Sequence, residues 1–289
     1  MIRFDDARDL VSTSWLADHL HDPNVRIVDV RWYLDNRRGE DAYRSGHLPG
    51  AIHLNVDKDL AAPTGPNAPG RHPLPVPVSF ADLLSSIGVG PSTQVIAYDD
   101  DGGSRAARLW WMLRYFGHGL GGVLDGGWNQ WLAEGRPVTK TVPRISRAQP
   151  MELVALPRFV VDKSLVIELQ ERESALILDA RVPERYAGLE EPFDPRAGHI
   201  PGALNAPYVD NLVATGGVFR PVSDLREHFL HLGVEPNLPV VVYCGSGITA
   251  CHTILALHLA GFSETQLYEG SWSDWSRDPS LPIKTGLAP

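Results

Sequence analysis

The residues best suited to covalent chemistry in this sequence lie in one glycine-rich segment, Cys244-Gly245-Ser246-Gly247-Ile248-Thr249. An apolar run precedes the segment and a helical pattern begins at Thr249, so the sequence predicts a loop between a strand and a helix N-terminus. Main-chain N–H groups in such a loop form an anion nest, and Gly245 and Gly247 let the backbone curl around it. These donors and the helix dipole are expected to stabilise a thiolate on Cys244, which would then be a nucleophile.

Cys244 admits two other interpretations, a phosphatase nucleophile and a buried structural thiol. A phosphatase loop also places a cysteine before a helix, but it needs an arginine six residues later to clamp the phosphoryl oxygens. That position holds Ala250, so phosphate-ester hydrolysis is excluded. The plainer alternative for Cys244 is a buried free thiol at a strand end. Cys251 lies inside the helical pattern, where a small core residue is the simpler interpretation.

The chain contains the same series of motifs twice. An Asp-x-Arg motif, a Gly-His-x-Pro-Gly-Ala motif, a tyrosine that ends an apolar run and a tryptophan pair follow one another in both halves. They begin or lie at Asp29, Gly46, Tyr98 and Trp128/Trp131, and again at Asp179, Gly198, Tyr243 and Trp272/Trp275. This order indicates duplication of a whole domain. The first half has Asp99 where the second has Cys244, so the histidines of the shared motif, His47 and His199, are interpreted as structural.

The elements around these motifs alternate between strand and helix. Short apolar runs at 94–98 and 240–243 predict strands buried on both faces. Helices are predicted at 80–87, after a possible cap at Ser79, and at 105–116 and 249–260, each of the last two ended by glycine. Such alternation predicts α/β domains, each with a mostly parallel sheet covered by helices on both faces. We place the first domain at 1–141, a proline-containing linker at 142–158 and the second domain at 159–289.

Composition narrows the possible functions. The formal net charge of −9 argues against nucleic-acid binding and against adhesion to an anionic membrane. No apolar run is long enough to cross a bilayer. Only two cysteines occur among 289 residues, which argues against a disulfide scaffold and favours the cytoplasm. No metal site is indicated, because the histidines are scattered and no four-cysteine site is possible. The sequence implies no organic cofactor either.

Taken together, the duplicated blocks and the Cys244 loop resemble the rhodanese family over nearly the whole chain. The tandem arrangement is similar to that of its 3-mercaptopyruvate and thiosulfate sulfurtransferases. The resemblance implies two rhodanese-like domains, the first without a catalytic cysteine and the second catalytic. It also implies that Cys244 carries sulfur as a persulfide in a nest formed by Gly245, Gly247, Ile248 and Thr249.

The neutral Gly245-Ser246 pair resembles the mercaptopyruvate enzymes, because thiosulfate-preferring relatives have basic residues there. By the same resemblance, Ser246 works with His72 and Asp57 to stabilise the enolate that the reaction releases. Arg185 matches the family's first arginine that binds the substrate carboxylate. Arg196 is the candidate for the second, in a segment that is shorter than that of the relatives and differs from it in sequence. Without the resemblance, His72 would be interpreted as a loop histidine, and both arginines as surface residues paired with acids.

The expected reaction moves sulfane sulfur from a small anionic donor, 3-mercaptopyruvate, to a thiol or cyanide acceptor such as a thioredoxin-like protein. One alternative with the same fold is thiosulfate:cyanide transfer. Another is a persulfide relay or binding module that has little activity alone. The specificity constants for mercaptopyruvate and thiosulfate separate the two donors. A chain that is loaded only by a partner's persulfide would be the relay module.

Overall fold

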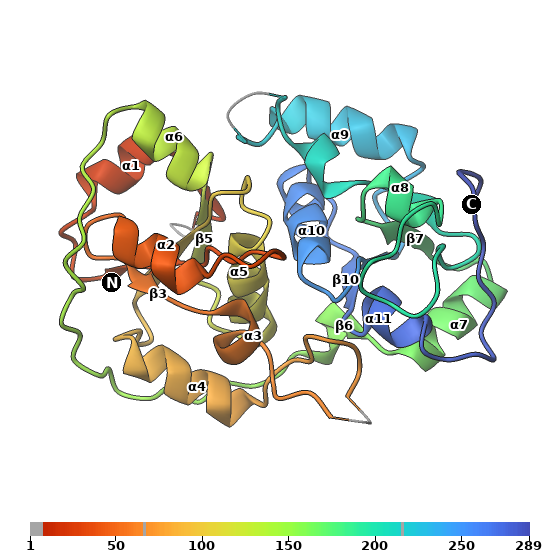
Figure 1. Ribbon diagram of the computed structural model, residues 1–289, viewed down its shortest axis with the longest axis horizontal. Helices are drawn as coiled ribbons and strands as arrows, with labels where there is room; N and C mark the ends of the chain where they lie inside the picture. The colour runs from red at the N-terminus through yellow and green to blue at the C-terminus, as the bar shows by residue number, and fades with distance from the viewer. Residues whose placement is uncertain (1–7, 66–67, 215–216) are drawn as a thin grey trace. The chain divides into compact units, whose positions relative to one another are not determined.

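The computed structural model describes residues 8–65, 68–214 and 217–289, which form two compact units (Figure 1). The first unit comprises Met1–Ala62, Leu74–Leu156 and Val213–Phe219, and the second comprises Pro63–Pro73, Pro157–Leu212 and Arg220–Pro289. Each unit therefore includes a short segment from the other half of the chain, which the motif pattern did not predict. The domain limits 1–141, 142–158 and 159–289 remain a prediction, and residues 1–7 lie outside the described residues.

The first unit is built on a five-stranded parallel sheet of order β1-β5-β4-β2-β3. Its strands are β1 (Leu10–Val11), β2 (Val25–Asp29), β3 (Ile52–His53), β4 (Gln94–Tyr98) and β5 (Gly121–Leu124). Its helices are α1 (Thr13–Asp18), α2 (Gly39–Ser45), α3 (Val56–Asp59), α4 (Pro77–Ser86), α5 (Ala106–Tyr115) and α6 (Gly127–Ala133). The predicted strand at 94–98 is confirmed as β4, and all five of its residues are buried.

The second unit repeats this sheet, with the order β6-β10-β9-β7-β8 and parallel pairing throughout. Its strands are β6 (Val160–Val161), β7 (Leu176–Asp179), β8 (Leu204–Asn205), β9 (Val240–Tyr243) and β10 (Thr265–Tyr268). Its helices are α7 (Lys163–Glu171), α8 (Pro183–Tyr186), α9 (Val222–His231), α10 (Thr249–Leu259) and α11 (Ser271–Trp275), with 3₁₀ turns η2 (Pro157–Phe159) and η3 (Tyr208–Asn211). The predicted α/β class with two parallel sheets is thus confirmed.

Alternation along the strands gives each sheet two apolar faces. In the first unit, Ile27 and Ile96 pack with Leu16 of α1 and Trp131 of α6 on one face. On the other face α5 approaches so closely that a Cβ on Gly121 would lie 2.9 Å from a methyl carbon of Leu113. Helices therefore cover both faces of this sheet, as expected for a parallel sheet.

The duplicated motifs form one buried network in each unit. In the first unit the register pairs Asp29 with Tyr98, and the Tyr98 hydroxyl donates to Asp29 Oδ2 at 2.6 Å. Arg31 donates to the same carboxylate and, at 2.7 Å, to the carbonyl of Gly46, while its guanidinium lies 4.3 Å from the Trp128 ring centroid. The motifs recur because they form a single structural cluster.

The second unit builds the same cluster from the second set of motifs. Arg181 donates to Asp179 and to the Gly198 carbonyl, and its guanidinium lies 4.6 Å from the Trp272 ring. His199 stacks on Tyr186 and its Nδ1 lies 2.8 Å from that residue's carbonyl, as His47 does with Tyr43 in the first unit. The structural interpretation of both histidines agrees with these contacts.

The ends of the predicted helices agree with the structure to within one residue, except at the start of the helix expected at 80–87. Helices α5 and α10 stop before Gly117 and Gly261, whose positive φ values of 84° and 85° favour glycine. The helix expected after Ser79 begins earlier instead, with Pro77 at its first position and no side-chain cap. Proline's fixed φ and missing N–H suit a first helical position, so Ser79 is not the cap.

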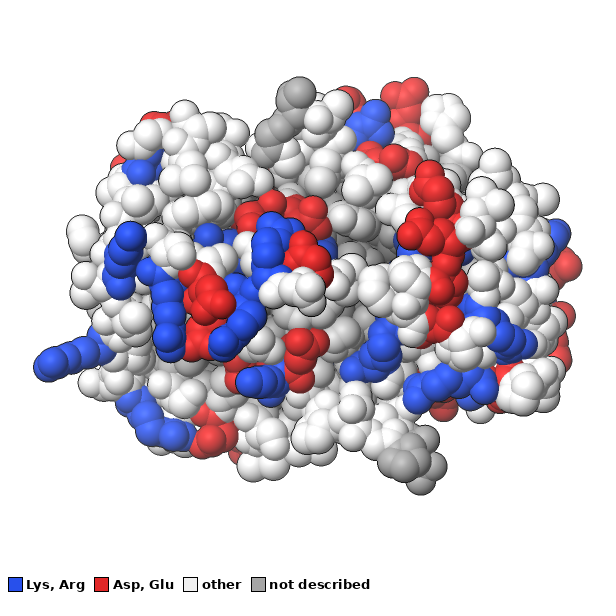
Figure 2. All heavy atoms as spheres, in the orientation of Figure 1, with Lys and Arg blue, Asp and Glu red and all other residues white. Residues whose placement is uncertain are grey.

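The described residues show how charged side chains are distributed over the surface and how the titratable groups cluster. On the face that Figure 2 draws, Lys and Arg side chains are interspersed with Asp and Glu, and the described residues form no broad basic area there. Among the described residues, no group of three or more His, Cys, Asp or Glu side chains could hold a metal ion. The helices of that part of the chain are too short or too polar to span a membrane.

Candidate active site

Cys244 follows β9 directly and precedes α10, as the sequence predicted for the reactive loop. The Gly247 N–H donates a hydrogen bond to Cys244 Sγ at 3.2 Å, and the φ of Gly247 is 78°, which favours glycine. Helix α11 fixes the loop from the other side, because the Trp272 N–H donates to the Cys244 carbonyl at 3.0 Å. Cys244 is 2% exposed. The sulfur therefore lies at the mouth of a helix with a main-chain amide directed at it.

The matching loop of the first unit shows what such a backbone binds. Asp99 follows β4 as Cys244 follows β9, and its carboxylate accepts four main-chain N–H groups at 2.7–2.9 Å. The donors are Asp101, Gly103, Arg105 and Ala106. Burial raises the pKa of Asp99, while the amides of Ala106 and Asp101 oppose that rise. A carboxylate thus fills the nest of the first unit, which supports an anionic group at the same place in the second.

Ser246 and His72 meet beside the cysteine. Ser246 Oγ lies 2.7 Å from His72 Nδ1, and each residue is 7% exposed. His72 belongs to the Pro63–Pro73 segment of the second unit, so the chain brings it from far away in sequence. Ile248 and Thr249 complete the loop, as the last residue before α10 and its first. The expected pairing of serine with histidine is therefore present in the structure.

Asp57, the third member of the expected group, lies on α3 in the first unit. Its carboxylate accepts a hydrogen bond from Trp32 Nε1 at 2.7 Å. Its proposed part in orienting His72 remains a prediction.

Arg185 lies beside the loop, and part of its guanidinium is already paired with acidic side chains. Its Nη2 donates to both oxygens of Glu191 at 2.7 and 2.9 Å, and Asp194 Oδ2 is 3.5 Å from the same nitrogen. Glu191 also pairs with Arg181, at 3.2 Å. Arg185 Nε is buried without a hydrogen-bond partner among the described residues. This guanidinium therefore retains a donor that the described residues do not use.

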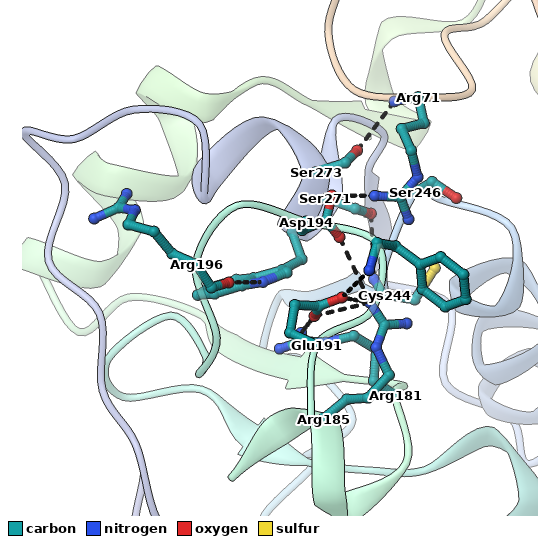
Figure 3. A network of polar contacts seen from close by, with 12 residues as sticks. Arg71, Arg181, Arg185, Glu191, Asp194, Arg196, Cys244, Ser246, Ser271 and Ser273 are labelled. Carbon is teal, nitrogen blue, oxygen red and sulfur yellow. Dashed lines mark hydrogen bonds and ion pairs between the residues drawn. The ribbon is translucent and has the colours of Figure 1, made fainter. Parts of the chain in front are cut away.

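The guanidinium of Arg196, which the resemblance assigned to the substrate carboxylate, is bonded to the chain's own backbone instead. Its guanidinium donates to the main-chain carbonyls of residues after α11, at Trp275, Ser276, Asp278 and Leu281. In Figure 3 it points away from Cys244. We therefore assign Arg196 to holding the C-terminal segment, because its donors are used by the chain's own backbone.

Arg71 reaches the cysteine loop, and no motif in the sequence pointed to it. A Cβ on Gly245 would lie 3.1 Å from Arg185 Nη1 and 3.2 Å from Arg71 Nη2, so both guanidiniums approach the loop (Figure 3). The Arg71 N–H donates to Ser273 Oγ at 3.0 Å, which ties this arginine to α11. The only signal in the sequence was its position next to His72. The two arginines can together bind an anionic group beside the sulfur.

Comparisons with known proteins agree with this geometry. The family model for the rhodanese-like domain matches residues 12–134 and 162–278. A probable 3-mercaptopyruvate sulfurtransferase of Pseudomonas aeruginosa is 40% identical over 286 residues, 96% of this chain and 98% of that protein. The thiosulfate sulfurtransferase of Cricetulus griseus is 34% identical over 284 residues, 93% of this chain and 92% of that protein. The crystal structure of the 3-mercaptopyruvate sulfotransferase SseA from Escherichia coli superposes with a TM-score of 0.81 and 32% identity, covering 92% of this chain and 100% of that one.

Proposed function

Because this chain belongs to the rhodanese family and is a sulfurtransferase, we propose that it takes sulfur from 3-mercaptopyruvate as a persulfide on Cys244. The Cys244 thiolate attacks the thiol sulfur of the donor. The bond between that sulfur and carbon 3 breaks, its electron pair forms the enolate of pyruvate, and a proton converts the enolate to pyruvate. A thiol or cyanide then attacks the outer sulfur, the S–S bond breaks and the Cys244 thiolate is restored.

The observation that carries the choice of donor is the contact between Ser246 and His72 near the cysteine. Cleavage of mercaptopyruvate releases an enolate, whose negative oxygen needs a positioned hydrogen-bond donor. The Ser246 hydroxyl, 2.7 Å from His72 Nδ1, can supply one when Nδ1 carries a proton and donates to Oγ, because the hydroxyl proton is then directed at the enolate. Thiosulfate releases sulfite and forms no enolate, so it has no need of this pair.

The donor's carboxylate also needs a cationic binding site, and Arg71 and Arg185 supply it. Both guanidiniums lie next to Gly245, immediately after the nucleophile. The small neutral Gly245 lets them approach, since a larger residue there would meet both. The donor's carboxylate would thereby be held close to the sulfur to be attacked.

Thiosulfate transfer to cyanide is the second candidate, because two arginines also suit a compact dianion and several relatives are thiosulfate sulfurtransferases. Measuring kcat/KM for both donors with one acceptor decides between them. A higher value for mercaptopyruvate supports the proposal, and a clear preference for thiosulfate contradicts it.

Replacing Ser246 with alanine is expected to lower kcat/KM for mercaptopyruvate by about 10²-fold, because the enolate loses its hydrogen-bond donor. Thiosulfate serves as the control donor in the same variant, and its kcat/KM should change by less than about threefold. Steady-state rates with both donors measure the two effects. Equal losses would mean that Ser246 holds the loop together and does not act on the enolate.

A further inference from the structure

The segment Glu190–Asp194 places two carboxylates against the arginines beside Cys244 (Figure 3). Glu191 lies between Arg181 and Arg185, and Asp194 lies between Arg185 and Arg71. The side chains of both acids are 3% exposed. The guanidiniums available to a donor anion are thus already in contact with anions of the chain itself.

Glu191 and Asp194 differ in how many hydrogen bonds their carboxylate oxygens accept. Glu191 receives hydrogen bonds from two arginines on its Oε2 and from Arg185 again on Oε1. Asp194 Oδ1 pairs with Arg71, but Asp194 Oδ2 is buried without a hydrogen bond from any described residue, 3.5 Å from Arg185 Nη2. Burial raises the pKa of the Asp194 carboxyl, and Arg71 opposes that rise. An unbonded buried carboxylate oxygen costs free energy, which makes Asp194 the weaker counter-ion of the two.

The charges of this cluster balance among the described residues. Three arginines, Arg71, Arg181 and Arg185, face three carboxylates, Asp179, Glu191 and Asp194. Apart from the Cys244 thiolate, the cluster therefore carries no net charge before the donor binds. An entering monoanion leaves it with one excess negative charge and an entering dianion leaves it with two. Since Coulomb energy scales with the charge of the ligand, the dianion is penalised more.

We propose that Asp194 is a donor-specificity residue, whose carboxylate shares the Arg71–Arg185 pair with the donor and disfavours dianions relative to monoanionic carboxylates. The proposal rests on the proposed function, which gives the arginine pair to the donor's anionic group. It assigns the discrimination against thiosulfate to a residue outside the cysteine loop. Phe193, 40% exposed and 5.1–5.8 Å from both guanidinium carbons, covers the same pair and keeps part of the water away.

The test measures binding without sulfur transfer, in the full chain carrying Cys244→Ser. Isothermal titration gives the Kd of thiosulfate, a dianion, and of pyruvate, a monoanion, with and without Asp194→Asn. We expect the thiosulfate Kd to fall on the order of tenfold and the pyruvate Kd by about threefold, because one negative charge is removed next to each ligand. Glu190→Gln is the matched control: it removes the same charge from an exposed side chain of the same segment and should change neither Kd by more than about twofold.

An unchanged ratio of the two Kd values, or weaker binding of both ligands in Asp194→Asn, would overturn the proposal. Asp194→Ala is the second variant and should shift the ratio in the same direction, because it removes the same charge. Unfolding of both variants would assign Asp194 to the scaffold and also overturn the proposal. A failure of the proposed function would appear separately, as a wild-type chain that gains no sulfur from mercaptopyruvate while the binding ratio still shifts.

Discussion

Cys244→Ser is expected to abolish sulfur transfer, with a loss of kcat on the order of 10³-fold or more for either donor. A serine hydroxyl at the same place is not ionised at neutral pH, and the Gly247 amide that contacts the sulfur cannot make it a nucleophile of comparable strength. The fold should persist, because the loop is also held by main-chain bonds from α11. Steady-state assays with mercaptopyruvate and with thiosulfate measure the loss.

Cys251→Ser is the matched control for this substitution. Cys251 is fully buried in α10, where its Sγ donates to the Gly247 carbonyl at 3.3 Å. A serine hydroxyl can make the same hydrogen bond, so the variant should keep most of its activity and lose only a little stability. Similar losses in the two variants would show that the second cysteine takes part in the reaction.

The second large effect concerns stability. Asp29→Asn should lower the free energy of unfolding of the first unit by about 3–5 kcal/mol. The carboxylate is fully buried, and it accepts hydrogen bonds from Arg31 and from the Tyr98 hydroxyl. Arg31 is only 3% exposed, so its charge would be left in the interior without a full counter-charge. Urea unfolding followed by tryptophan fluorescence measures the change.

The chain contains a control with the same local geometry. Asp35 and Arg37 are also two residues apart, and Arg37 donates to Asp35 through its N–H at 2.8 Å and through Nε, as Arg31 does with Asp29. Their side chains are 56% and 66% exposed, so water already screens this pair. Asp35→Asn should leave the urea midpoint unchanged. If both variants shifted the midpoint equally, burial would not be the cause.

The duplicated motifs made much of the fold predictable. They recur because Asp29, Arg31, Tyr98 and Trp128 meet in one buried cluster, and the second unit needs the same cluster. The strands at 94–98 and 240–243 were also predictable, since continuous apolar runs of that length suit a sheet covered on both faces. The loop of Cys244 followed from its glycines and from the helix pattern after it.

The remaining features depend on contacts that are distant in sequence. Arg196 was expected at the substrate, but its partners are carbonyls about 80 residues further along the chain, and no local pattern reveals them. Arg71 reaches the loop because residues 63–73 belong to the second unit, although they precede it by far in sequence. Ser79 is not the cap because Pro77 takes the first helical position, three residues before the predicted start at Phe80.

The persulfide on Cys244 can be tested by the intact mass of the wild-type chain after reaction with mercaptopyruvate, without an acceptor. We predict that the protein gains the mass of one sulfur atom, that peptide mapping places it on Cys244, and that adding a thiol or cyanide removes it. An unchanged mass, with pyruvate still released, would contradict the persulfide. So would a sulfur atom found on Cys251.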